Sequence, residues 1–362
     1  MRRSRRCATT STGIWKTNEA GGRTEPGGRK PGTGLDRMHE SASRKALRNR
    51  QRPIMTHRPV ALLAFASLCS TLPAGAQQAE RRPLGQVLAE APDENWRTLD
   101  PANTLYVRLD SGVVVIELAP AFAPRHVENI RALVRAGAFD GGAVVRSQDN
   151  YVAQWTIAAD LPGAGEDATA TAPGGAALAL PAEFEAPIGD LPFTSLPDGD
   201  VYAPEAGFTL GFPVGHDPAA GSTWVAHCYG VVGVARGNDA DSGSGASLYA
   251  VTGHAPRHLD RNLTMAGRVI QGMELLATLP RGSGALGFYE FPETPAPIRS
   301  VRLGTDVPET ERLAIEILRT ESDTFRDVIE ARRFRTEEFF VHPVGRVELC
   351  NVQVPTRPLA RE

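Results

Sequence analysis

LYVRLDSGVVVIELAPAFAPRHVENIRALVRAGAFDGGAVVRSQDNYVAQW, residues 105–155, is the stretch that decides the fold. Apolar and polar residues alternate before the turn at Ser111-Gly112, and a β-rich run follows at 113–118, which together predict a β-hairpin. Apolar residues then recur at helical spacing up to Gly137 and predict a short amphipathic helix. Strands are expected next at 143–146 and 151–155. This order indicates a mainly β domain.

The order of these elements resembles the first half of the cyclophilin-type peptidyl-prolyl cis-trans isomerases. The matching motifs run through residues 103–304. They are the Ala123-Pro124 helix start with Asn129, the Phe139-Asp140-Gly141 turn, the strand ending in Arg146, the GVAR run at 233–236 and the GRVIQGM run at 267–273. The resemblance implies a closed antiparallel eight-stranded barrel with two capping helices.

The chain before this domain divides into three parts. Residues 1–54 are basic without apolar periodicity, so we expect either an untranslated segment upstream of Met55 or a disordered arm. Residues 55–76 have a basic start, an apolar run shorter than the ~20 residues of a membrane span, and small residues ending at Ala76. They predict a signal peptide, a periplasmic or secreted protein, and no membrane span. Residues 77–102 indicate a mobile leader in which Trp96 docks on the barrel.

Two further segments fall outside the family pattern. A short strand is expected at 178–184, and the insertion at about 186–222 is rich in proline, which favours a surface segment without a central strand or a helix. Residues 305–362 show helical spacing and predict a C-terminal helical extension, with a final strand at 346–354.

The charge and the cysteines of the exported part limit its partners. From Gln77 onward the chain has 24 basic and 38 acidic residues, which argues against a nucleic-acid partner because phosphates need Lys and Arg. We expect a monomer that acts on proline-containing polypeptides. Cys228 and Cys350 are the two cysteines of this part, and the sequence leaves open whether they form a disulfide or remain apart.

Isomerisation of an X-Pro bond requires no nucleophile, metal or cofactor. The obstacle is the partial double bond of the amide, with a barrier of about 18–20 kcal/mol. A hydrogen bond to the prolyl nitrogen lowers this barrier, and a permanently charged arginine is suited to donate it. The resemblance assigns that catalytic role to Arg146, and it assigns to Gln154 the role of holding the substrate backbone.

The resemblance also implies a set of substrate-binding residues, four of which depart from the family pattern. A phenol replaces phenylalanine at 249, serine replaces glutamine at 247, and leucine replaces histidine at 263. Histidine stands at 258, where many members of the family have an aromatic residue. The departures leave open an alternative function, a catalytically weak or inactive module that binds proline peptides or acts as a chaperone. The expected binding residues are Tyr151, Val152, Ala235, Ser247, Tyr249, His258 and Leu263.

Other motifs do not indicate a cofactor or a metal. The GxGxxG match at 282–287 follows a predicted helix rather than a strand, which argues against a dinucleotide site. His254 and His258 have helical spacing, but Pro256 lies between them and favours a loop. We therefore predict neither a metal nor a cofactor.

Overall fold

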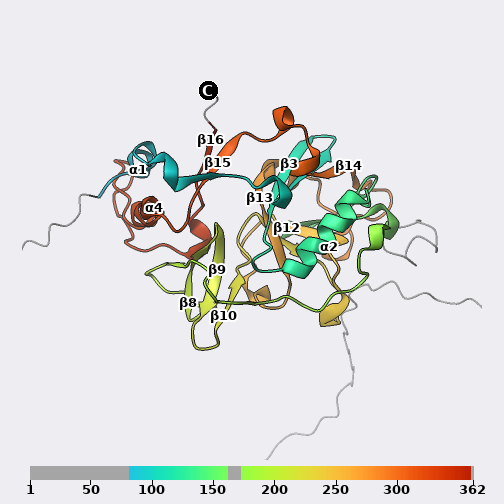
Figure 1. Ribbon diagram of the computed structural model, residues 1–362, viewed down its shortest axis with the longest axis horizontal. Coiled ribbons are helices and arrows are strands. Elements are labelled where there is room, and N and C mark those ends of the chain that lie inside the picture. Colours follow the sequence, from blue (N-terminus) through green and yellow to red (C-terminus); the bar gives the residue numbers. More distant parts are fainter. Residues whose placement is uncertain (1–80, 162–172, 360–362) are drawn as a thin grey trace, which may run out of the picture. The chain divides into compact units, whose positions relative to one another are not determined.

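Eight antiparallel strands close into a barrel in the order β11-β12-β5-β4-β14-β2-β3-β13 in this computed structural model. Figure 1 labels the barrel strands β3, β12, β13 and β14. The structure describes residues 81–161 and 173–359; the predicted signal peptide and the basic segment before it lie outside the described residues. The hairpin and the mainly β fold are confirmed. The strands are β2 (Thr104–Leu109), β3 (Gly112–Leu118), β4 (Ala143–Ser147), β5 (Val152–Thr156), β11 (Val231–Val234), β12 (Ser247–Val251), β13 (Met265–Gln271) and β14 (Ala296–Leu303).

Two helices, α2 (Pro124–Arg135) and α3 (Met273–Ala277), cap the barrel as expected. Apolar side chains of both helices, among them Ile130 and Leu276, belong to the same buried cluster as the inward-facing strand residues. Proline occupies the first turn of α2, where the missing N–H has no intrahelical acceptor.

Residues 178–184 form no strand, so the prediction for this segment was wrong. The Glu183 carboxylate instead accepts hydrogen bonds from the amides of Arg125 and His126 at 3.1 and 3.0 Å. The Glu183 amide donates to the Thr264 hydroxyl at 3.1 Å rather than to a neighbouring strand. The segment therefore provides acceptors for the free backbone N–H groups in the first turn of α2, where a negative charge is favourable.

The insertion folds into a five-stranded sheet together with the next residues, 223–225, which corrects the prediction of a surface segment without a central strand. Its order is β6-β10-β9-β8-β7, so β9 is central although it contains Pro213. The Pro213 carbonyl still accepts from the Ala226 amide at 2.9 Å, and only the N–H of that position is missing from the ladder. The strands are β6 (Ala186–Pro187), β7 (Thr194–Ser195), β8 (Glu205–Thr209), β9 (Phe212–Asp217) and β10 (Ser222–Val225).

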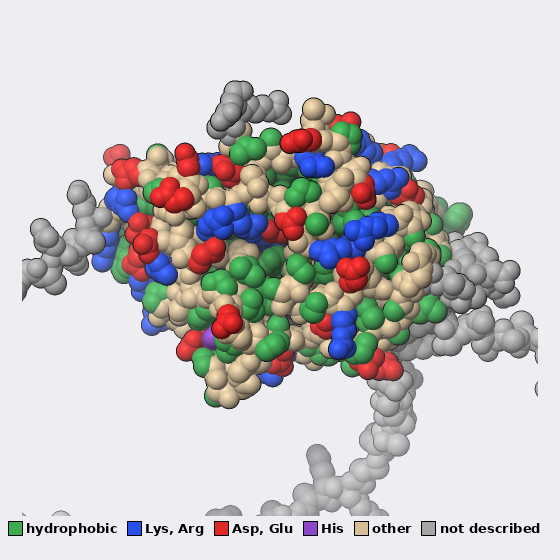
Figure 2. All heavy atoms as spheres, in the orientation of Figure 1, with side chains coloured by type: hydrophobic (Ala, Val, Ile, Leu, Met, Phe, Trp, Pro, Cys, Tyr) green, Lys and Arg blue, Asp and Glu red, His purple; other side chains and the backbone are tan. Residues whose placement is uncertain are grey.

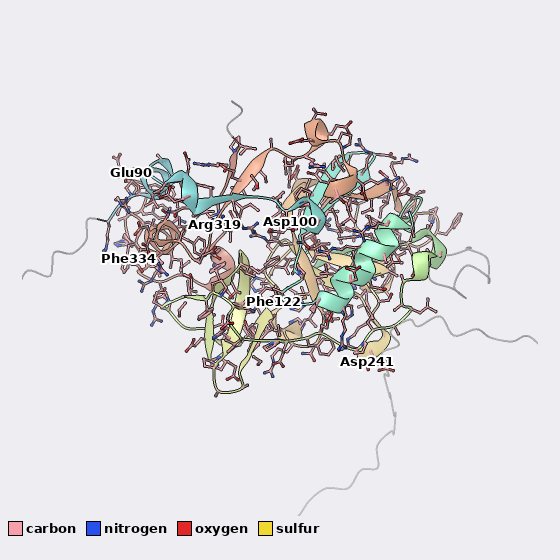
Figure 3. The ribbon with its side chains drawn as sticks, in the orientation of Figure 1. Glu90, Asp100, Phe122, Asp241, Arg319 and Phe334 are labelled. Carbon is pink, nitrogen blue, oxygen red and sulfur yellow. A yellow bond between two sulfur atoms is a disulfide. The ribbon has the colours of Figure 1, made fainter. Side chains whose placement is uncertain are left out.

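The leader and the C-terminal extension pack on this sheet and build a second apolar core. The Phe208 ring meets Phe325 edge-on with centroids 5.0 Å apart, and Phe122, labelled in Figure 3, packs likewise on Phe212 at 5.7 Å. Trp96 is buried in this core and not in the barrel. The elements are α1 (Leu84–Ala89), β1 (Trp96–Thr98), β15 (Ile315–Leu318), α4 (Asp323–Arg333) and β16 (Thr356–Pro358).

Two predictions for these terminal segments are therefore corrected. The described part of the leader is ordered, because β1 pairs with β15 and α1 packs on α4. The described part of the extension, residues 305–359, contains one α-helix together with two strands, and its last strand is β16 rather than residues 346–354. Period-3.6 spacing in the sequence did not reveal strands this short.

Glu117 on β3 links the barrel to the second core. Its carboxylate accepts from Nε and Nη2 of Arg268 at 3.0 and 2.8 Å and pairs with Arg97 of β1 at 2.7 Å. The Arg268 guanidinium also lies 5.2 Å from the centre of the Phe212 ring. Burial lowers the pKa of Arg268, and the Glu117 carboxylate opposes that shift. Removing one partner would leave a buried charge unpaired, which is strongly destabilising.

A disulfide joins Cys228, just after β10, to Cys350 in the C-terminal extension, across 122 residues of sequence. Of the two possibilities that the sequence left open, the structure therefore has the paired one. Within the described ranges, no helix is long and apolar enough to cross a membrane.

We predict that removing this disulfide destabilises the second core. A cross-link across a long loop restricts the unfolded chain, and its loss typically costs about 2–4 kcal/mol. Urea unfolding with and without dithiothreitol should show a drop of that size in the free energy of unfolding. A Cys228→Ser/Cys350→Ser variant is the control and should not respond to the reductant. Equal stability of the oxidised and reduced wild type would contradict the prediction.

Candidate active site

Four residues from four adjacent strands lie in one row on the outer face of the barrel. Arg146 of β4 pairs with Gln154 of β5, Gln154 pairs with Tyr249 of β12, and Tyr249 pairs with Gly233 of β11. Their sequence neighbours, such as Ala153, point into the barrel core. The row brings together the two predicted catalytic residues and one predicted binding residue.

An extra residue in β4 turns Arg146 outward. Val144 faces the core, and strict alternation would point Arg146 inward as well. The register between β4 and β5 shifts between these two residues, so that Val145 has no partner on β5. Such a bulge re-aims the side chains that follow it. The amide of Tyr289 donates to the Val145 carbonyl at 3.0 Å and holds the bulge in place.

The Arg146 guanidinium is fixed by three acceptors. Nε donates to the Leu286 carbonyl at 2.7 Å, Nη1 donates to Gln154 Oε1 at 3.3 Å, and Nη2 donates to Gln148 Oε1. The rings of Tyr151 and Phe288 lie on either side, with centroids 5.6 and 5.4 Å from Cζ. The arginine is therefore held in one orientation while its side chain remains half-buried.

The surroundings of Arg146 change the pKa values of nearby groups. Burial lowers the pKa of Arg146, an effect that the nearby tyrosines Tyr151 and Tyr249 oppose. Burial raises the pKa of Tyr151 in spite of the neighbouring guanidinium. Burial likewise raises the pKa of Tyr249, so both phenols stay neutral at physiological pH. The guanidinium remains charged because an arginine side chain is effectively always protonated.

Gln154 is held from both ends of its amide. Its Oε1 accepts from Arg146, and its Nε2 donates to the Ser247 hydroxyl at 3.1 Å. Ser247 in turn donates to the Trp155 carbonyl at 3.2 Å. The serine that stands in place of the family's glutamine therefore orients Gln154, which fixes the amide with its oxygen toward the guanidinium.

An apolar cluster lies beside this row. Val152, Tyr249 and Val251 are its buried members, and three partly buried residues pack on them. Five of the seven predicted binding residues thus meet at one place. We call the three buried and three partly buried residues together the outer cluster: Tyr151, Val152, Ala235, Tyr249, Val251 and Leu263.

His258 is the predicted binding residue whose place at the site stays a prediction. It lies on a single 3-10 turn at Arg257–Leu259, and its side chain is exposed. Its neighbour Arg257 is buried instead and pairs with Asp200 and Asp260.

Sequence reasoning missed several residues that shape the site. Residues 282–287 were considered only as a dinucleotide motif, yet the Leu286 carbonyl and the ring of the following Phe288 contact Arg146. His227 was not singled out, although its Nε2 lies 3.0 Å from the Tyr249 hydroxyl. The phenol itself was the available signal, because a buried hydroxyl needs a partner, but the sequence could not say which residue provides it.

No cluster of three or more His, Cys, Asp or Glu side chains is positioned to hold a metal among the residues that the structure describes. A row of amide and guanidinium donors next to an apolar cluster can instead bind a peptide carbonyl or nitrogen together with a small apolar ring. That combination suits a substrate bound and twisted without covalent chemistry.

Comparisons with known proteins point to the same chemistry. Two curated relatives, from Brucella suis and Brucella abortus, are each named "Probable peptidyl-prolyl cis-trans isomerase". Each is 28% identical to this chain over 188 residues, which is 51% of this chain and 76% of the relative.

The crystal structure of the cyclophilin AquaCyp293 from Hirschia baltica superposes with a TM-score of 0.58 at 27% identity and covers 77% of this chain and 98% of that one. The family model described as cyclophilin type peptidyl-prolyl cis-trans isomerase/CLD matches residues 104–303. These residues span the closed barrel and the whole row of Arg146, Gln154 and Tyr249. The chain belongs to the cyclophilin-type peptidyl-prolyl cis-trans isomerase family.

Proposed function

We propose that this protein catalyses cis-trans isomerisation of X-Pro bonds, with Arg146 as the catalytic residue and the outer cluster as the site of the proline ring. The observation that supports this most directly is the row in which Arg146, Gln154 and Tyr249 lie side by side on the barrel surface. A charged donor and an apolar surface are thereby adjacent, as an X-Pro substrate requires.

Arg146 retains donors for a substrate. A guanidinium has five N–H groups, and three of them are engaged by Leu286, Gln154 and Gln148 within the described residues. The other two are left to reach the prolyl nitrogen. When the amide twists, its nitrogen loses conjugation with the carbonyl and becomes a better acceptor. A hydrogen bond that strengthens in the twisted state lowers the barrier without covalent chemistry.

The other contacts position the substrate. Gln154, oriented by Ser247, presents its amide next to Arg146, where it can hold the peptide backbone. The outer cluster offers apolar surface to the proline ring through its partly buried members Tyr151, Ala235 and Leu263, which pack on Val152 and Tyr249. Fixing both flanks while the central bond turns is the positioning part of catalysis.

A binding or chaperone module is the second candidate function. It is favoured by Leu263, an apolar side chain where the family pattern has a histidine, because one polar contact to the peptide is then absent. Such a module would bind the same peptides on the same outer cluster without accelerating their isomerisation.

We predict that Arg146→Ala lowers kcat/KM on a proline tetrapeptide by about ten- to a hundredfold. A hydrogen bond from a charged group contributes about 1.5–3 kcal/mol, and this one acts on the twisted state. Arg146→Lys is the matched control and should recover only part of the rate, since it keeps the charge but not the forked donors. The far-UV circular dichroism of both variants should match that of the wild type.

Two results would count against the proposed chemistry. Full activity of Arg146→Ala would exclude Arg146 as the catalytic residue. Absence of activity in the wild type, with proline peptides still bound, would favour the binding module.

We further propose that the protein works outside the cytoplasm as a monomer, on proline-containing segments of exported polypeptides and without a nucleic-acid partner. The signal-like residues 55–76 and the Cys228–Cys350 disulfide support export, because disulfides persist in oxidising compartments. The acidic balance from Gln77 onward supports the absence of nucleic acid, and Figure 2 shows acidic and basic side chains interleaved over the face in view.

Export predicts a specific N-terminus for the mature protein. When the full chain is produced in a bacterium, mass spectrometry of the periplasmic fraction should find a protein that begins at Gln77, directly after the expected cleavage site at Ala76. An uncleaved chain confined to the cytoplasmic fraction would contradict export.

A further inference from the structure

The hydroxyl of Tyr249 lies at the buried side of the outer cluster. Tyr249 is 5% exposed, and its hydroxyl has two neighbours, His227 Nε2 at 3.0 Å and the Met265 sulfur at 3.7 Å. A thioether is a weak acceptor. Because an unpaired buried hydroxyl is costly, the histidine is the partner that makes a tyrosine acceptable here.

The strand next to Tyr249 leaves room for this hydroxyl. Gly233 is its direct partner on β11. A Cβ placed on Gly233 would lie 2.3 Å from both Cζ and the hydroxyl oxygen of Tyr249, far inside van der Waals contact. The phenol can therefore reach His227 only because residue 233 has no side chain.

His227 is itself held in one orientation. Its side chain is fully buried, and both its backbone amide and its Nδ1 lie within hydrogen-bond distance of Asp260 Oδ1, at 3.0 and 2.9 Å. A carboxylate only accepts, so Nδ1 carries the proton and donates it. In the neutral ring, Nε2 then has a lone pair that can accept the O–H of Tyr249 at 3.0 Å.

The network continues into the insertion. Arg257 Nε donates to the second oxygen of Asp260 at 2.6 Å, and its two terminal nitrogens donate to the Asp200 carboxylate at 2.9 and 3.0 Å. Asp200 belongs to the inserted segment between β7 and β8. Burial disfavours the charged form of Asp260, but His227 and Arg257 outweigh it and lower the pKa of that carboxyl. The insertion is thus connected to the outer cluster through paired, buried charges.

We propose that His227 is a positioning residue for the proline site, which holds the Tyr249 ring in place by accepting its hydroxyl. This rests on the proposed function, because it assumes that the ring contacts a bound proline. Removing the acceptor frees the ring to move, which weakens a contact made equally in the ground state and in the twisted state. Such a loss raises KM and leaves kcat nearly unchanged.

A double-mutant cycle tests the proposal on the purified full chain, with His227→Leu introduced into the wild type and into Tyr249→Phe. In the wild type we expect His227→Leu to lower kcat/KM by about two- to tenfold, mainly through KM, the range that one lost hydrogen bond gives. In the Tyr249→Phe background the same change should have little effect, since no hydroxyl then needs an acceptor. His342→Leu, at an exposed histidine, is the matched control for the substitution.

Several outcomes would overturn the proposal. An equal loss in both backgrounds would mean that His227 acts independently of Tyr249, and no loss in either would mean that it does not position the site. Near-UV circular dichroism reports folding. If His227→Leu fails to fold in the wild type, it should fold in the Tyr249→Phe background. If the double variant also fails to fold, His227 is required for its hydrogen bonds with Asp260 and not for its contact with Tyr249.

The dissociation constant of the same tetrapeptide separates this proposal from the proposed function. A wild type that binds the peptide without isomerising it refutes the catalytic function, while the cycle measured in dissociation constants still tests His227. Non-additivity in those constants would then support the positioning role. A wild type that neither binds nor isomerises the peptide overturns both.

Discussion

The unpaired residue Val145 in β4 is the constraint on which the candidate site depends. Without it, strict alternation would point Arg146 into the barrel core beside Val144, where an unpaired guanidinium could not be buried. With it, Arg146 lies on the outer face, opposite Gln154 and in line with Tyr249. The loop that holds the bulge through the Tyr289 amide also supplies the Leu286 carbonyl that orients the guanidinium. The same local irregularity therefore exposes the catalytic group and fixes it.

The sequence could predict the barrel because its signals are local. The hairpin at 105–118 and α2 are visible as periodicity, and the family resemblance singled out Arg146, Gln154 and Tyr249, three of the four residues of the row. The bulge was not visible, because an extra residue in one strand is defined only by its partner strand. The role of His227 was hidden for a related reason, since it approaches Tyr249 through a contact between residues 22 positions apart. The role of His258 stays a prediction, because a family position in a loop does not determine where its side chain points.

The insertion was misjudged for a different physical reason. Prolines between 186 and 222 argue against a strand only where an N–H is needed, and Pro213 occupies a central strand whose ladder lacks one donor. The leader, the insertion and the extension each contribute residues to one buried cluster. Together they bury Trp96, Phe208 and Phe325 in a second core that the Cys228–Cys350 disulfide closes. Cooperation between segments far apart in sequence is not a local property, and neither periodicity nor composition reveals it.

A structure of the protein with a bound proline tetrapeptide, by crystallography or by intermolecular NMR contacts, is the most direct test of the proposed site. We predict that the proline ring lies on Val152, Tyr249 and Leu263, with an Arg146 N–H within hydrogen-bond distance of the prolyl nitrogen and the Gln154 amide on the peptide backbone. A peptide bound elsewhere on the protein, with Arg146 making no contact to it, would contradict the assignment of the row and the outer cluster as the place where the X-Pro bond turns.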